Sequence, residues 1–344
     1  MSNNYPHFIF VLNPWCLRLT VCLIGILQVV SSATGQSPLL QKERKNESRT
    51  LNWELPTLGG QHFWSDVHYW GGWRIQRHSE TGHHRLLDSD QIRKAWGTRE
   101  HCHQSLQRLI QQKNIQPEQG TVVILLHGLW RSNDSMETLG DYINKKAGFT
   151  IINLAYASAR GKIETHADDL ASVIDGFSDQ ITEIHVVAHS MGNIVFRRYL
   201  GTLEQQGQSI DPRFKRMVML APPNQGSRVA RTLSKSLAFQ TLAGLGGVQL
   251  GAGWPALQPN LATPSFEFGI IAGSADENKN PSLLTPRDFT VFVNETQLPG
   301  ANGFHLGPYF HWNIKHHPQA MDETLHFLKT GKFLHPAEAP YSDQ

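Results

Sequence analysis

Apolar runs and amphipathic segments alternate along the chain from residue 121 onward. The runs TVVILLH, FTIINLAY, ITEIHVVAH and FKRMVMLA are separated by stretches with helical spacing, at about 134–147, about 163–177 and from 191. Continuous Val/Ile/Leu strands between helices are typical of a parallel sheet buried on both faces. We therefore predict an α/β fold with a mostly parallel central sheet and helices on both faces, closed by a helix over about 318–330.

Residues 34–118 follow a different pattern. A polar stretch at 41–50 resembles a solvated linker, and five of the nine tryptophans lie between it and the end of the extension. The stretch WRIQRHSETGHHRLLD, polar around Thr81 and Gly82, predicts a β-hairpin. Because large aromatic side chains dominate cores, we expect this Trp-rich extension to pack on the main domain, with its hairpin as opening strands of the larger sheet. An aromatic ligand platform is the alternative.

The N-terminal segment is apolar from Phe8 to Val30, where Arg18 is the one charged residue, and small residues lead to Ala33. This pattern predicts that residues 1–33 are a signal peptide cleaved near Ala33, or a membrane anchor over 8–30. We expect an exported protein, periplasmic or extracellular, or one associated with a membrane through this segment. Two of the three cysteines lie inside it, so after cleavage Cys102 remains without a disulfide partner.

Composition narrows the functional classes. Hydrophobic residues make up 40% of the 344 residues, which is enough for a globular core. The net charge of +2 provides no broad field to hold nucleic acid, so we exclude a nucleic-acid partner. Histidine pairs such as His83-His84 lack the spacing of metal ligands, and we predict neither a metal nor a cofactor. We divide the chain into the segment 1–33, the extension 34–118, a catalytic domain 119–332 and a polar tail 333–344.

A candidate nucleophile follows the third apolar strand. The residues Ala188-His189-Ser190-Met191-Gly192 match the G-x-S-x-G nucleophile elbow with Ala in the first small position. The turn in such an elbow is so sharp that the flanking side chains must be small, and its strain holds the serine hydroxyl up for reaction. We therefore predict Ser190 as a nucleophile.

A candidate oxyanion hole follows the first apolar strand, at His127-Gly128-Leu129-Trp130. An oxyanion hole needs two backbone N–H groups aimed at the developing negative charge. A glycine at a strand end lets the chain turn to present one of them, and the residue after the nucleophile presents the other. We predict the N–H groups of Leu129 and Met191 as the donors.

A serine nucleophile also needs a base and an orienting carboxylate, which follow it in the order Ser, Asp/Glu, His in this type of fold. The base should lie after the last strands and before the final helix, where four histidines stand: His305, His311, His316 and His317. His316 and His317 are placed to lead into the helix. Position alone leaves the choice open.

From about 121 to 332 the chain resembles an α/β hydrolase of the lipase/esterase type, and its A-H-S-M-G elbow is the form of small bacterial, Bacillus-type lipases. In that family the acid lies in a D-x-x-V segment, which Asp288-Phe289-Thr290-Val291 matches here. The resemblance then implies Asp288 as the acid and His311 as the base. Asp276, three residues after Gly273, is the alternative acid. Phe310 and Asn193 replace two glycines of the family pattern.

The resulting expectation is a serine hydrolase that cleaves carboxylic esters through an acyl-enzyme intermediate. The apolar segment 224–262 could cap the site, which favours lipid or other apolar esters, or could merely pack on the sheet. The same triad could instead serve an amidase or a lipid-anchor deacylase. A third alternative is a noncatalytic envelope-binding module with the hydrolase fold.

Overall fold

The computed structural model describes residues 55–56, 62–234, 236–275 and 290–337, and every structural statement below concerns these. Their elements belong to one compact unit, Thr50–Gln344. The predicted targeting segment 1–33 and linker 41–50 lie outside the described residues. None of the helices described is both long and apolar enough to cross a membrane.

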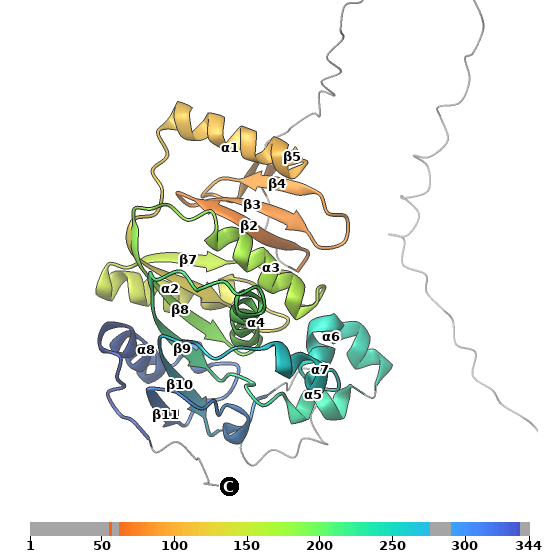
Figure 1. Cartoon of the computed structure of the whole chain (residues 1–344), viewed down its shortest axis with the longest axis vertical. Helices are drawn as coiled ribbons and strands as arrows, with labels where there is room; N and C mark the ends of the chain where they lie inside the picture. Colours follow the sequence, from red (N-terminus) through yellow and green to blue (C-terminus); the bar gives the residue numbers. More distant parts are fainter. Residues whose placement is uncertain (1–54, 57–61, 235, 276–289, 338–344) are drawn as a thin grey trace, which may run out of the picture. The chain divides into compact units, whose positions relative to one another are not determined.

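A six-stranded parallel sheet forms the centre of this unit, as the apolar runs predict (Figure 1). Its strand order is β11-β10-β9-β8-β6-β7, and every neighbouring pair is parallel. The strands are β6 (Gly120–Leu126), β7 (Thr150–Leu154), β8 (Ile181–His189), β9 (Phe214–Leu220), β10 (Glu267–Gly273) and β11 (Gly303–Gly307). Because all six run the same way, the residues after their carboxyl ends share one edge of the sheet.

Helices cover both faces of this sheet, which confirms the prediction. The helices α3 (Ile163–Ile174) and α4 (Met191–Gln205) pack in one core cluster with strand side chains such as Ile124 and Val186. The helices α2 (Asp134–Ala147) and α8 (Pro318–Thr330) pack in the other, with Val123 among its strand side chains. Alternate residues of one strand therefore serve opposite cores, which explains why the strands read as unbroken apolar runs.

The Trp-rich extension forms a second sheet of its own (Figure 1). Its order is β1-β5-β4-β3-β2, all pairs are antiparallel, and the predicted hairpin is confirmed between β3 and β4. The strands are β1 (Leu55–Pro56), β2 (Trp64–Trp70), β3 (Trp73–His78), β4 (His84–Leu87) and β5 (Ile92–Gly97), followed by helix α1 (Arg99–Lys113). The expectation that these strands open the larger sheet is wrong, because each of them pairs only with other strands of the extension.

A small core holds the extension together. Trp73 is buried there with Ile75, Leu86 and the α1 residue Leu106, as expected for packed aromatics. Trp96, in contrast, is 38% exposed. Cys102 also lies in this core, and burial raises the pKa of its thiol to about 12, so it is an inert packing residue.

An insertion with three helices joins β9 to β10. They are α5 (Arg228–Leu233), α6 (Leu237–Gln249) and α7 (Trp254–Leu257). Arg197 of α4 fastens the insertion, because its guanidinium donates to the carbonyl oxygen of Ala262 at 2.9 Å and to Asn224 Oδ1 at 3.1 Å. The predicted apolar segment 224–262 is thus largely helical and anchored at both ends.

Candidate active site

Ser190 occupies a strained turn between β8 and α4. Its backbone has φ +53° and ψ −123°, values that a side-chain-bearing residue rarely adopts. The N–H of Ser190 donates to the carbonyl oxygen of Leu220 at 2.9 Å, which fastens the turn to β9. Gly192 follows where the chain passes β6, and a Cβ built on it would lie 2.7 Å from the Leu126 carbonyl oxygen. The strained conformation is the one expected of a nucleophile elbow.

Asn193, where the lipase pattern has a glycine, braces this turn. Its side chain is fully buried, and its Nδ2 donates to the carbonyl oxygen of Ser190 at 3.0 Å and to that of Leu220 at 3.4 Å. The departure from the family pattern therefore adds support to the elbow. It leaves the serine hydroxyl in place.

His311 meets Ser190 at the carboxyl edge of the sheet. Its Nε2 lies 3.0 Å from Ser190 Oγ, although 121 residues separate the two in the chain. His311 stands in the loop between β11 and α8, and its carbonyl oxygen accepts a hydrogen bond from His189 Nε2 at 2.9 Å. Burial, with a smaller effect from Lys315, holds the pKa of His189 well below 6.5, so His189 is a neutral donor that holds the loop.

The other three histidines considered for the base lie elsewhere. His305, in β11, interacts through Nδ1 with the carbonyl oxygen of His335 and through Nε2 with the hydroxyl of Tyr309. His316 ends the 3-10 helix η6 (Ile314–His316), and His317 immediately precedes α8, as predicted. Both candidate acids, Asp288 and Asp276, lie outside the described residues, so the choice between them remains a prediction.

The two predicted oxyanion donors are close to this pair. Met191 is the first residue of α4, where helical N–H groups have no partner within the helix. A Cβ built on Gly128 would lie 3.1 Å from the Cβ of Ser190, so the loop before Leu129 runs directly beside the serine. In the part of the chain that the structure describes, neither Leu129 nor Met191 donates a backbone hydrogen bond.

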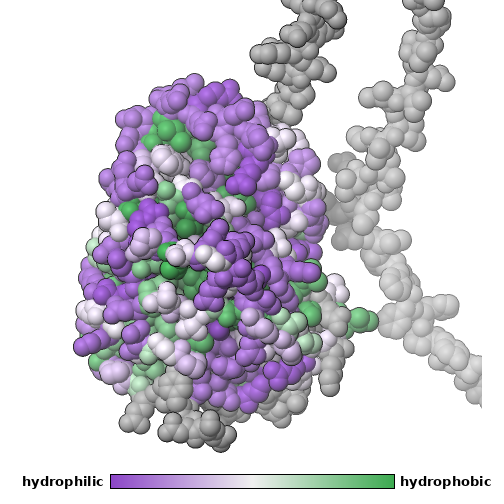
Figure 2. Space-filling view, viewed as in Figure 1, coloured by the Kyte–Doolittle hydropathy of each residue, from purple (hydrophilic) through white to green (hydrophobic). Residues whose placement is uncertain are grey.

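The insertion covers the donors with apolar surface. Gly247 of α6 approaches the Leu129 side chain, and Gly246 approaches the sulfur of Met191. Nearby on the chain, Leu245 is 53% exposed, and Trp312 beside His311 is 58% exposed. Figure 2 shows a mostly hydrophilic face on which apolar residues form small groups separated by polar ones. One exposed apolar side chain thus follows His311 in sequence, and another belongs to the helix that packs on the oxyanion residues.

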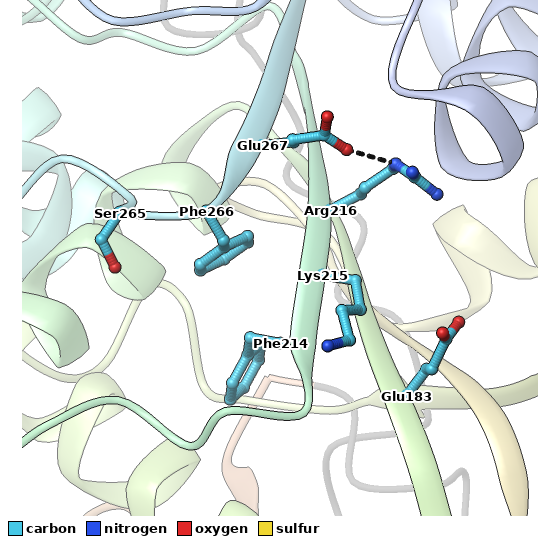
Figure 3. A pocket seen from close by; sticks show the side chains of 7 residues that line it. All are labelled: Glu183, Phe214, Lys215, Arg216, Ser265, Phe266 and Glu267. Atoms are coloured by element: carbon cyan, nitrogen blue, oxygen red, sulfur yellow. Dashed lines mark hydrogen bonds and ion pairs between the residues drawn. The ribbon is translucent and has the colours of Figure 1, made fainter.

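A polar pocket lies at the opposite edge of the same sheet (Figure 3). Its volume is about 370 Å³, and it is lined by the first three residues of β9, by residues 265–267 at the start of β10 and by Glu183 near the start of β8. Its Arg216 pairs with Glu267 at 2.7 Å and donates to the carbonyl oxygens of Leu328 and Lys329 at the end of α8. This arrangement ties a helix end to the sheet, at the amino ends of the strands and away from Ser190.

The described residues contain no group of three or more His, Cys, Asp or Glu side chains placed to hold a metal ion. Two of the histidines considered as metal ligands, His83 and His103, have aromatic neighbours. His83 stacks on Trp96 with ring centroids 5.7 Å apart, and His68 lies 4.7 Å from His103.

Sequence reasoning missed two buried residues near the site. Tyr156, after β7, stacks on His127, and Lys315 lies buried in η6 with its Nζ 2.8 Å from the carbonyl oxygen of Trp312. Burial lowers the pKa of Lys315 to about 8, with a further contribution from Arg131. Neither residue belongs to a short motif; the one available signal is that Tyr156 follows the carboxyl end of a parallel strand.

Comparisons with known proteins agree on the fold. Residues 119–241 match a family model described as "Alpha/beta hydrolase of unknown function (DUF900)". A comparison with curated proteins found no match. Together with the parallel sheet and its flanking helices, the family match shows that the chain has the α/β-hydrolase fold.

Solved structures similar to the chain include the lipase BlEst2 from Bacillus licheniformis, with 16% identity and a TM-score of 0.41 over 56% of this chain and 86% of that one. The esterase from the archaeon Pyrobaculum calidifontis has 15% identity and a TM-score of 0.41, over 62% and 77%. The phospholipase PlaB from Legionella pneumophila has 15% sequence identity and a TM-score of 0.40, over 52% of this chain and 44% of that one. At such low identity and overlap, nothing about activity follows from these likenesses.

Proposed function

We propose that this protein is a serine hydrolase of carboxylic esters, with Ser190 as nucleophile and His311 as base. The observation that supports this most directly is the 3.0 Å approach of His311 Nε2 to the hydroxyl of a serine in a strained elbow. A hydroxyl of ordinary acidity is a weak nucleophile, and a base at this distance can take its proton as it attacks. Loss of that hydrogen-bonded pair would leave no activated nucleophile.

The reaction then proceeds in two halves. His311 accepts the proton as Ser190 Oγ attacks the ester carbonyl, and the N–H groups of Leu129 and Met191 stabilise the resulting oxyanion. His311 returns the proton to the leaving alcohol as the acyl-enzyme forms. Water, activated by the same histidine, then releases the acid. We propose Asp288 as the carboxylate that orients His311, with Asp276 as the alternative.

Apolar esters are the substrate class that the surroundings favour. Trp312 is exposed directly after His311, and Leu245 is exposed in α6 next to Gly246, which approaches the sulfur of Met191. Exposed apolar side chains on the elements around a reactive serine suit an acyl chain or another apolar group. A series of p-nitrophenyl esters of increasing chain length, run beside the matching anilides, tests this. We expect turnover of the esters that rises with chain length; anilides cleaved at least as fast would favour the amidase alternative.

A fluorophosphonate probe tests the nucleophile. We expect it to label Ser190 in the folded protein, as located by peptide mass spectrometry, and we expect Ser190→Ala to lower ester turnover by at least about a thousandfold. Ser172→Ala is the matched control, because Ser172 lies in α3 with its hydroxyl bonded to the Asp168 carbonyl. A folded wild-type protein without label on Ser190 would refute the proposal and favour the binding-module alternative.

The acid is tested separately. Replacing the orienting carboxylate by its amide leaves the geometry in place but favours the wrong tautomer of the base, which costs up to about 10⁴-fold in kcat in the known test case. We expect Asp288→Asn to show a loss of this order and Asp276→Asn to keep most of the activity. The reverse result would assign the acid to Asp276.

A further inference from the structure

Tyr156 supports the oxyanion loop from behind. Its hydroxyl donates to the carbonyl oxygen of His127, and its ring stacks on the His127 imidazole with centroids 4.1 Å apart and planes 14° apart. Both side chains are buried. The first residue of the loop is therefore fixed at its carbonyl and at its ring by one tyrosine.

The His127 imidazole in turn fixes the next peptide. Its Nε2 faces the Tyr156 N–H at 3.4 Å, and an N–H can only donate, so Nε2 accepts and Nδ1 carries the proton. That Nδ1 lies 2.9 Å from the carbonyl oxygen of Gly128, to which it donates. Burial lowers the pKa of His127 to about 4, so this neutral form persists at ordinary pH.

The geometry of a peptide then orients the predicted oxyanion donor. A trans peptide is planar, so its C=O and its N–H point in opposite directions. Because His127 holds the Gly128 carbonyl on its own side, the N–H of Leu129 faces away from His127. Gly128 itself lies beside Ser190 and His189, as the close approach of a built Cβ to both shows.

Strand β2 of the second sheet forms hydrogen bonds with the residues on both sides of Tyr156. Asp66 accepts from the N–H of Ala155 at 2.8 Å and donates its own N–H to the Ala155 carbonyl at 2.8 Å. Ser65 Oγ accepts from the N–H of Ala157 at 3.2 Å. Three hydrogen bonds thus connect two adjacent residues of β2 to the segment that carries Tyr156.

The Asp66 carboxylate is itself held rigidly. Its side chain has no exposed surface, Arg74 Nη1 donates to Oδ2 at 3.1 Å, and Gln76 Nε2 donates to Oδ1 at 2.8 Å. Both partners belong to β3, the strand paired with β2. Both carboxylate oxygens of Asp66 are therefore bonded, and turning the buried carboxylate away would leave the donors of Arg74, Gln76 and Ala155 without this acceptor.

We propose that the added antiparallel sheet is part of the catalytic apparatus: through Asp66 and then Tyr156 it holds His127 so that the Leu129 N–H is aimed at the oxyanion. This inference rests on the proposed function, since it assigns positioning residues for that reaction. Tyr156 and Asp66 touch no reacting atom and act through the loop. The extension is then needed for the rate of the reaction as well as for stability.

A thiono substrate gives a readout that depends on the hole. Sulfur is a larger and weaker hydrogen-bond acceptor than oxygen, so an intact oxyanion hole favours a p-nitrophenyl ester over its thionoester. We expect Tyr156→Phe to lower kcat about tenfold to a hundredfold, less than loss of a donor, with KM within about twofold. The ester-to-thionoester ratio of kcat/KM should fall with it. Asp66→Asn should change both quantities in the same direction.

Tyr199→Phe is the matched control, because Tyr199 is also a buried tyrosine but lies about two turns along α4 from Met191, with its ring 5.8 Å from that of Phe196. It should leave kcat and the ratio unchanged. Two outcomes overturn the inference alone, given a wild type that is labelled and active. In the first, Tyr156→Phe and Asp66→Asn keep the wild-type kcat and ester-to-thionoester ratio. In the second, they lose kcat but keep the wild-type ratio. A wild type that is neither labelled at Ser190 nor active overturns the proposed function, and the inference with it.

Discussion

Gly192, in the elbow, packs directly against the backbone at the start of the oxyanion loop. A Cβ there would meet the carbonyl oxygens of Leu126 and His127 at 2.7 and 2.8 Å, and backbone atoms cannot move aside as a flexible side chain can. We expect Gly192→Ala to separate loop and elbow and to lower kcat/KM by about a hundredfold, comparable to loss of one oxyanion donor. Steady-state kinetics on a p-nitrophenyl ester measures this.

Gly82→Ala serves as the control for that variant. Gly82 has φ +71° in the turn between β3 and β4, and no atom lies within 4 Å of a built Cβ. The alanine is strained there but far from the serine, so it should lower stability by about 1 kcal/mol and leave kcat/KM unchanged. Equal effects of the two variants on kcat/KM would contradict the steric explanation.

Lys315 is a buried cation next to the site. Its pKa of about 8 lies below the usual 10.5, so below pH 8 the folded protein bears the full cost of burying the charge. Between pH 8 and about 10.5 the native state releases the proton before the unfolded state does, and wild-type stability rises. We expect Lys315→Met to raise the free energy of unfolding at pH 7 by roughly 1–3 kcal/mol.

The pH profile distinguishes this electrostatic effect from packing. Urea unfolding of both proteins at pH 7 and pH 10 should show the advantage of Lys315→Met shrinking at the higher pH. A packing effect, or loss of the hydrogen bond to Trp312, would give the same difference at both values. That constancy would show that the ammonium charge is not the cause.

Helix α6 contains a break at Gly244 that no sequence pattern predicts. Gly244 has φ +60° and ψ −169°, and a Cβ there would lie 1.9 Å from the Ala159 carbonyl oxygen. The break lets the following turn place Gly246 and Gly247 against Met191 and Leu129. We expect Gly244→Ala to move α6 off the oxyanion residues, to raise KM for long-chain esters and to expose α6 to cleavage, with a local strain of about 1–3 kcal/mol.

Limited chymotrypsin digestion and kinetics over ester chain length measure this effect. Gly148→Ala is the control, because Gly148 also has a positive φ at the end of α2 but has open space around it. If Gly244→Ala were cut no faster than Gly148→Ala and had an unchanged KM, α6 would not line the substrate site.

At the scale of the whole molecule, what the sequence could predict depends on how local the signal is. The strands from β6 to β9 and the helices between them were predictable, because each carries its own periodicity. The elbow at Ser190 was also predictable, since strain and small neighbours are local. The separate sheet of the extension was not predictable, because the alternation of apolar and polar residues in a strand does not indicate which other strand it pairs with.

The site divides in the same way. His311 was reached through the order of residues in a resembling family, with His305 excluded only once its bonds to Tyr309 and His335 were seen. Tyr156 and Asp66 were out of reach, because their importance lies in contacts across 89 residues between Asp66 and Ala155. No periodicity or short motif records such a contact.

The buried histidines make the whole molecule sensitive to acid. Burial lowers the pKa to about 4 for His68, His127 and His185, to about 3 for His166, and well below 6.5 for His189. Below pH 6.5 these histidines bind protons in the unfolded chain but stay neutral in the native state. The free energy of unfolding therefore falls as pH falls from about 6.5 toward 4. Each such histidine adds up to about 1.4 kcal/mol per pH unit to the slope. Because a domain is stable by only about 5–15 kcal/mol, we expect cooperative unfolding between roughly pH 6 and 4.5.

Urea unfolding followed by circular dichroism from pH 8 to pH 4.5 measures this slope, and His185→Leu tests its cause. His185 lies in β8 against Phe149 and apart from the Ser–His pair, so a leucine fits its surroundings without touching the chemistry. The variant should keep its ester turnover. Its free energy of unfolding should fall less steeply with pH, by up to about 1.4 kcal/mol per pH unit, so that it resists acid better than the wild type below pH 6. An unchanged slope would show that carboxylates, which titrate lower, govern acid unfolding instead.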